Sequence, residues 1–120
     1  MRRGAAVAVL IALAACSSSS TPKASGSPSP VATSAVNAKD YEFLPANIAV
    51  KAGTTVTWSF VGAVPHTVTS ADPRVTFDSG QKTKGTFTFT FSQPGTYHYY
   101  CKLHGSASGQ GMAGTVTVTS

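Results

Sequence analysis

Hydrophobic and polar residues alternate in a series of short runs from about Val36 to the end of the chain. In Thr54–Phe60 and Thr86–Phe91 the aromatic residues and Val56 fall on every second position, which is typical of strands with one face in a core. Gly, Pro and Ser separate the runs, and no helical period occurs beyond the first 15 residues. The pattern predicts an all-β sandwich or barrel formed by residues 36–120. Its other strands are expected at 36–43, 48–50, 66–69, 77–79, 95–101 and 114–119.

The first 15 residues have the composition of an export signal. Arg2 and Arg3 precede an apolar run, residues 4–15, that is too short to cross a bilayer as a helix. The run ends in Leu-Ala-Ala followed by Cys16, which resembles the bacterial lipobox. We therefore expect cleavage before Cys16 and lipidation of its thiol. The alternative is an ordinary signal peptide with a chance cysteine.

Residues 16–35 are rich in Ser and Pro and offer nothing that could form a core. This composition predicts a disordered tether. The sequence is thus expected to form an exported lipoprotein, anchored on the extracytoplasmic side of a bacterial membrane. The net charge of +5 comes from scattered residues without a basic run, so nucleic acid is not an expected partner.

Cys16 and Cys101 are the only cysteines of the chain. If Cys16 carries lipid, Cys101 has no partner, and a lone thiol in an oxidising compartment needs a metal or a reaction to occupy it. A disulfide between the two would instead join the tether to the folded domain. Tyr97, Tyr99 and Cys101 share one strand face, so Cys101 is expected to point into the core.

Three further residues complete a mixed sulfur and nitrogen donor set with Cys101. His104 follows in a Cys-x-x-His motif, His66 lies upstream after Pro65, and Met112 lies just before the last strand. Two His, one Cys and a weak axial Met are typical of copper electron-transfer sites. Structural zinc sites usually have more Cys, and Met is a poor zinc ligand.

Each of these residues also has a simpler interpretation. Cys101 could be an inert core residue, His66 and His104 ordinary edge or surface histidines, and Met112 a core side chain with Gln110 as the axial donor. The third histidine, His98, lies on the strand face opposite Cys101 and is predicted to be structural or solvated.

Taken in order, several motifs resemble the cupredoxins, and most closely the plastocyanin-like group of small blue copper proteins. The resemblance covers about residues 40–120, and the motifs that carry it are Phe43-x-Pro45, Pro65-His66-x-Val68, Gly95-x-Tyr97-x-Tyr99-Tyr100-Cys101-x-x-His104 and Met112-x-Gly114-x-Val116-x-Val118. It implies a Greek-key β-sandwich of about seven to eight strands with one type 1 copper ion. By this resemblance His66, Cys101 and His104 are the strong ligands and Met112 the weak axial one.

The chain departs from the family pattern at three places. Thr67 stands where the family often has an Asn that braces the ligand loop, and Phe60 stands where Asn is also common. The Gly-rich spacer 105–111 is longer than usual, which predicts a looser loop around Met112.

The resemblance implies single-electron transfer between redox proteins, which could be membrane-bound, by a monomer. His104 and Tyr100 are the expected routes for electrons. A copper carrier or buffer is the alternative function. An enzyme is not expected, because a Cys/His hydrolase would need an orienting group and an oxyanion site, and three histidines are too few for a second copper site. With only four acidic residues, an acidic docking patch is not expected either.

Overall fold

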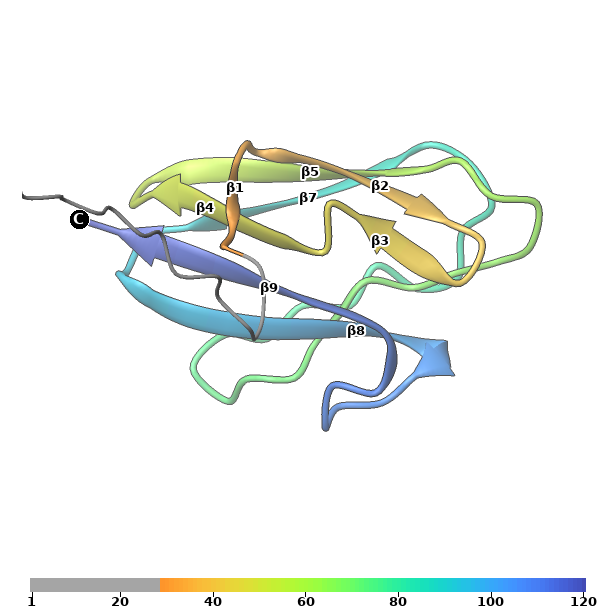
Figure 1. Cartoon of the computed structure of the whole chain (residues 1–120). Helices are drawn as coiled ribbons and strands as arrows, with labels where there is room; N and C mark the ends of the chain where they lie inside the picture. The colour runs from red at the N-terminus through yellow and green to blue at the C-terminus, as the bar shows by residue number, and fades with distance from the viewer. Residues whose placement is uncertain (1–28) are drawn as a thin grey trace, which may run out of the picture.

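The computed structural model describes residues 29–120, which form nine strands in two sheets packed face to face (Figure 1). One sheet has the order β1-β4-β9-β8-β6 and the other β3-β2-β5-β7. The predicted all-β sandwich is confirmed, with two of the strands only two residues long. The strands are β1 (Val31–Ala32), β2 (Ala35–Lys39), β3 (Glu42–Leu44), β4 (Asn47–Lys51), β5 (Thr54–Phe60), β6 (Thr69–Ser70), β7 (Thr86–Phe91), β8 (Gly95–Gly105) and β9 (Gly111–Thr119).

The apolar side chains at every second position of the strands point inward and fill the space between the sheets, as the sequence predicts. Val56, Trp58 and Phe60 of β5 are buried, and so are Tyr97 and Tyr99 of β8. The Trp58 and Tyr99 rings meet edge to face across the two sheets, with centroids 5.3 Å apart. This packing fixes β8, the strand that carries two of the predicted metal ligands, against the opposite sheet. None of the described residues belongs to a helix that is long and apolar enough to span a membrane.

The single strand predicted at 36–43 is wrong, because the chain reverses in its middle. β2 and β3 are antiparallel neighbours joined at Asp40 and Tyr41. Tyr41 has φ of 72°, a conformation found in turns rather than strands. The carboxylate of Asp40 accepts hydrogen bonds from backbone N–H groups of Ala63 and Val64, which holds the turn against the loop after β5.

The segments 66–69 and 77–79, predicted as strands, are mostly irregular and are held together in part by hydrogen bonds to serine side chains. Only Thr69 and Ser70 form a strand, while His66 and Asp78 take part in isolated bridges. The N–H of Val68 donates to the hydroxyl of Ser79. The N–H of Phe77 donates to the hydroxyl of Ser70. Serine oxygens thus take backbone donors that a regular ladder would use.

The folded part of the chain begins before residue 36. β1 lies inside the segment expected to be a tether and pairs in parallel with β4, with Val31 opposite Ile48. The prediction failed here because a two-residue strand is too short to show a period. The export signal and Cys16 lie outside the described residues, so both remain predictions.

The Gly-rich spacer after His104 is a hairpin instead of the loose loop that its composition suggests. β8 and β9 extend beyond their predicted ends until Gly105 pairs with Gly111. The turn between them is closed by backbone bonds from Ser106 N–H to Gln110 O (3.0 Å) and from Gly109 N–H to Ser106 O (2.9 Å). The hairpin therefore brings Met112 back to the chain segment that carries His104.

Candidate metal centre

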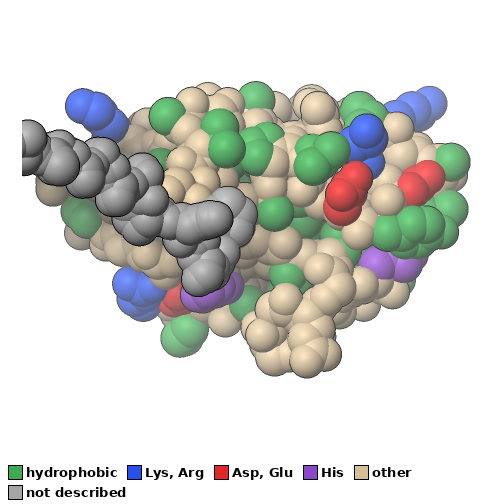
Figure 2. Space-filling view, viewed as in Figure 1, with side chains coloured by type: hydrophobic (Ala, Val, Ile, Leu, Met, Phe, Trp, Pro, Cys, Tyr) green, Lys and Arg blue, Asp and Glu red, His purple; other side chains and the backbone are tan. Residues whose placement is uncertain are grey.

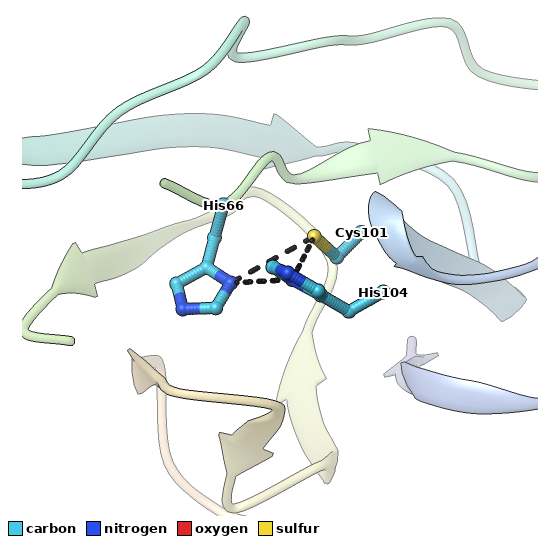
Figure 3. A group of neighbouring side chains, drawn as sticks. All are labelled: His66, Cys101 and His104. Carbon is cyan, nitrogen blue, oxygen red and sulfur yellow. Dashed lines mark hydrogen bonds between the residues drawn. The ribbon is translucent and has the colours of Figure 1, made fainter. Parts of the chain in front are cut away.

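Three of the predicted ligands converge at one end of the sandwich. Nδ1 of His66 lies 3.1 Å from Nδ1 of His104, and the Sγ of Cys101 lies 3.9 Å and 3.6 Å from these two nitrogens (Figure 3). Among residues 29–120, no other cluster of three His, Cys, Asp or Glu side chains has its ligand atoms within 4.8 Å of one another. The segments that carry them meet at the end of the molecule opposite the C-terminus (Figure 1).

Cys101 is a free thiol on the inner face of β8 and is wholly buried, as its strand parity predicts. The backbone N–H of Thr67 donates to its sulfur at 3.4 Å. The thiolate is the form of cysteine that binds metals, and this N–H group points at the atom that would carry its negative charge. Burial also keeps the sulfur away from oxidants in the solvent.

Backbone and side-chain contacts together fix His66. Its N–H and C=O bond to the C=O and N–H of Lys82 at 3.0 Å and 2.9 Å. Its ring is fully buried, and Nε2 lies 3.0 Å from Oδ1 of Asp40. The N–H groups of Ala63 and Val64, followed by His66, hold the pKa of the Asp40 carboxyl below its usual range, so Asp40 is ionised at neutral pH.

His104 is half-buried on the part of β8 that continues beyond the bulge in its pairing with β9. The ring of Tyr41 meets it edge to face, with centroids 4.9 Å apart, and lies 6.3 Å from the ring of His66. Sequence reasoning missed both Asp40 and Tyr41, because it placed them in the middle of a strand. The Lys-Asp-Tyr-Glu cluster between two alternating runs was the available signal for a turn.

Thr67 braces the site from the position where the family often has Asn. Its hydroxyl accepts the N–H of Lys102 at 2.9 Å and lies 2.9 Å from the hydroxyl of Thr69. Its backbone N–H donates to the sulfur of Cys101. One residue therefore ties the segment carrying His66 to the segment carrying Cys101.

Met112 is 1% exposed near the start of β9. Its backbone packs so closely against Gly105 that a Cβ added to Gly105 would lie 2.3 Å from the carbonyl oxygen of Met112. Gln110, the alternative axial donor, is exposed in the hairpin turn. Of these two candidates, only Met112 is enclosed by the protein.

Two other residues singled out in the sequence, Tyr100 and His98, do not belong to the cluster. Tyr100 is half-buried and pairs with Thr69 and Ala113. His98 is exposed on the outer face of β8, as predicted.

The three clustered donors fit a single metal ion. A triangle of this size has a point about 2 Å from every corner, which is the length of first-row metal bonds to nitrogen and sulfur. Nδ1 of His66 faces the other two donors, while Nε2 of the same ring faces Asp40. One thiol with two imidazoles is a donor set suited to copper or zinc.

Comparison with known proteins identifies several relatives. The sequence profile of the cupredoxin-like domain family matches residues 6–118. A chloroplastic plastocyanin of Physcomitrium patens is 36% identical over 89 residues, covering 64% of this chain and 50% of that protein. A plastocyanin of Scenedesmus fuscus is 30% identical over 86 residues, covering 63% of this chain and 85% of that protein.

Solved structures show the same fold. A purple cupredoxin from Nitrosopumilus maritimus superposes with a TM-score of 0.61 at 29% identity, covering 72% of this chain and all of that one. The chain spans only about half the length of the Physcomitrium patens relative, with 50% of that protein covered.

Proposed function

The chain belongs to the cupredoxin-like family and holds one copper ion, and from this premise we propose that it carries single electrons between redox proteins outside the cytoplasm. The observation that supports the proposal most directly is the preformed cluster of one buried thiol and two imidazoles. These ligands serve both oxidation states of copper, so the protein can exchange an electron without exchanging ligands.

The chain's own residues provide the conditions for this exchange. Copper supplies the Cu(II)/Cu(I) couple when it is bound. The bridge from His66 to Lys82 and the bonds made by Thr67 restrain the ligand positions. A restrained site changes little in geometry when its charge changes, which lowers the barrier to electron transfer.

We place Met112 as the axial ligand in this proposal. A thioether is the weak axial donor typical of a His₂Cys copper site. Burial of Met112 and exposure of Gln110 both favour this assignment.

Electrons enter and leave near His104 in this proposal, with Tyr100 as a second route. At this end of the molecule hydrophobic, acidic and histidine side chains lie close together (Figure 2). Tyr41 and Leu103, which contact or adjoin His104, are 61% and 43% exposed. Two of the four acidic side chains of the chain, Asp72 and Asp78, are paired with Arg74 and Lys102, which favours an apolar docking face over an acidic one.

We also propose that lipid on Cys16 anchors the monomer on the extracytoplasmic side of a bacterial membrane. The Leu-Ala-Ala-Cys sequence supports this. Mass spectrometry of the native N-terminus tests it, and an unmodified Cys16 or cleavage elsewhere would contradict it.

The colour of the copper-loaded protein tests the proposed function. We expect intense blue absorption with Cu(II), from charge transfer between the Cys101 thiolate and copper, and reversible bleaching on reduction. Cys101→Ser should abolish the absorption, whereas Cys16→Ser, as the matched control, should leave it unchanged. A colourless wild-type complex with Cu(II) bound would contradict a type 1 site. A blue protein that exchanges no electrons with added redox proteins would favour a copper carrier.

A further inference from the structure

The carboxylate of Asp40 lies behind His66, on the side of the ring away from the other two ligands. Nε2 of His66 is 3.0 Å from Oδ1 of Asp40, while Nδ1 of the same ring faces His104 and Cys101. Neutral imidazole has one protonated nitrogen and one with a lone pair. A carboxylate at Nε2 requires the proton there, so Nδ1 is left free to bind metal.

The protein holds this carboxylate in a fitted position. The N–H of Ala63 lies 2.9 Å from both carboxylate oxygens, and the N–H of Val64 lies 3.1 Å from Oδ1. A Cβ on Gly62 would lie 2.1 Å from Oδ1, so the loop can close around Asp40 only because residue 62 is glycine. The β2–β3 turn and the loop before His66 are thereby joined through one side chain.

We propose that Asp40 is a positioning residue that sets the tautomer, the orientation and the donor strength of His66. A carboxylate at the outer nitrogen makes an imidazole a more basic metal ligand. Its negative charge stabilises Cu(II) more than Cu(I), so Asp40 lowers the reduction potential of the site. The inference rests on the proposed function, because it concerns how the same copper site is tuned.

The first test uses the wild-type chain and needs no substitution. In the metal-free protein, where no copper bond dictates the tautomer, nitrogen NMR should show His66 protonated at Nε2, and that proton should exchange slowly with water. His98, which is exposed, provides the internal comparison. If the His66 ring proton exchanges as fast as that of His98, or if His66 carries its proton at Nδ1, the proposal is overturned.

The second test compares Asp40→Asn with Asp72→Asn. Asparagine keeps an acceptor oxygen for the loop but removes the charge. Asp72 is paired with Arg74, which bonds to Thr96 at the start of β8, away from the ligands. The control therefore removes the same charge without touching the site.

We expect Asp40→Asn to weaken Cu(II) binding about 10- to 100-fold, with a smaller loss for Cu(I). A tenfold difference between the two losses corresponds to a rise of about 59 mV in potential for a one-electron couple. The electron paramagnetic resonance spectrum should change as well. The Asp72→Asn protein should keep the copper affinity, the reduction potential and the electron paramagnetic resonance spectrum of the wild type.

The outcomes separate this inference from the proposed function. A blue wild-type protein whose potential moves no more with Asp40→Asn than with Asp72→Asn would overturn the role of Asp40 and leave the copper assignment intact. A colourless protein would contradict the assignment itself. Thermal unfolding of the metal-free variants shows whether Asp40→Asn folds, and if it does not, the NMR test on the wild-type chain decides.

Discussion

The hydroxyl of Thr67 accepts the backbone N–H of Lys102, the residue after Cys101. Within residues 29–120, no other side chain of the segment around His66 bonds to the backbone at this point. Thr67 is 2% exposed, so water cannot replace its bonds. Thr67→Val keeps the shape of the side chain but leaves the N–H of Lys102 without its partner. We expect a loss of about 1–3 kcal/mol in the free energy of unfolding, measured by urea denaturation of the metal-free protein.

Thr67→Ser is the matched control for this substitution. It keeps the hydroxyl and removes only a methyl group, so most of the stability and the absorption of the copper form should be retained. Equal losses for the valine and serine variants would show that packing of the methyl group, and not the hydroxyl bond, is what matters.

Substitution of Met112 tests the axial assignment. The strong bonds come from one thiolate and two imidazoles, so Met112→Leu should keep copper and colour. We expect its reduction potential to rise, because the last donor to Cu(II) is lost, whereas Met112→Gln should lower the potential by adding a harder oxygen donor. If neither variant changes the potential or the electron paramagnetic resonance spectrum, Met112 is not a ligand.

The three clustered ligands could be predicted from the sequence because Cys and His are residue types that bind metals. Cys101 and His104 are three positions apart, and the burial of Cys101 followed from the period of its own strand. Asp40 and Tyr41 were not predictable in the same way. Each makes its contact with a segment distant in the sequence, Asp40 with the loop after β5 and Tyr41 with β8. A period of two along the chain carries no information about such contacts.

At the scale of elements, the hairpin between β8 and β9 sets the position of His104 relative to Met112. Gly105 has no room for a side chain, since a Cβ there would meet the Met112 carbonyl oxygen at 2.3 Å. Gly105→Ala must therefore push the two strands apart. We expect a loss of about 1–3 kcal/mol in stability, the range typical of overpacking, together with a changed visible spectrum of the copper protein.

Gly109→Ala is the control that distinguishes the effect of this steric clash from the effect of backbone strain alone. Gly109 has φ of 97° and open space around its Cα, so alanine there should cost about 1–2 kcal/mol through its left-handed conformation alone. Its copper spectrum should match that of the wild-type protein. A normal spectrum for Gly105→Ala as well would show that the hairpin does not position the ligands.

Long alternating runs were predicted well, and the segments between them were not. The predicted bounds of β5 and β7 match the structure because their apolar positions repeat several times. The 66–79 segment is shaped by serine hydroxyls that bond to backbone N–H groups. The direction in which a short polar side chain bonds depends on tertiary neighbours, so the hydrophobic pattern does not reveal it.

At the scale of the whole molecule, two of the metal ligands and the ion pair between Asp72 and Arg74 are located at different parts of β8. Cys101 and His104 occupy its second half, whereas Arg74 bonds to the carbonyl of Thr96 near its start and lies over the ring of Tyr97, 4.5 Å from the centroid. Asp72 orients Arg74 through two side-chain bonds. This pair ties the 71–76 loop to the sheet, so it should affect stability and leave the copper site unchanged.

Acid should reveal the contribution of this pair. Hydrogen bonds from Arg74 lower the pKa of the Asp72 carboxyl to about 2, compared with about 3.9 in an unfolded chain. Because the folded-state pKa is the lower of the two, the stabilisation is complete above about pH 4 and disappears as the pH falls through about 2. Urea unfolding of the metal-free wild-type and Asp72→Asn proteins from pH 7 to pH 2 should therefore give stability curves that converge at low pH. A difference as large at pH 2 as at pH 7 would show that the Asp72 charge does not contribute.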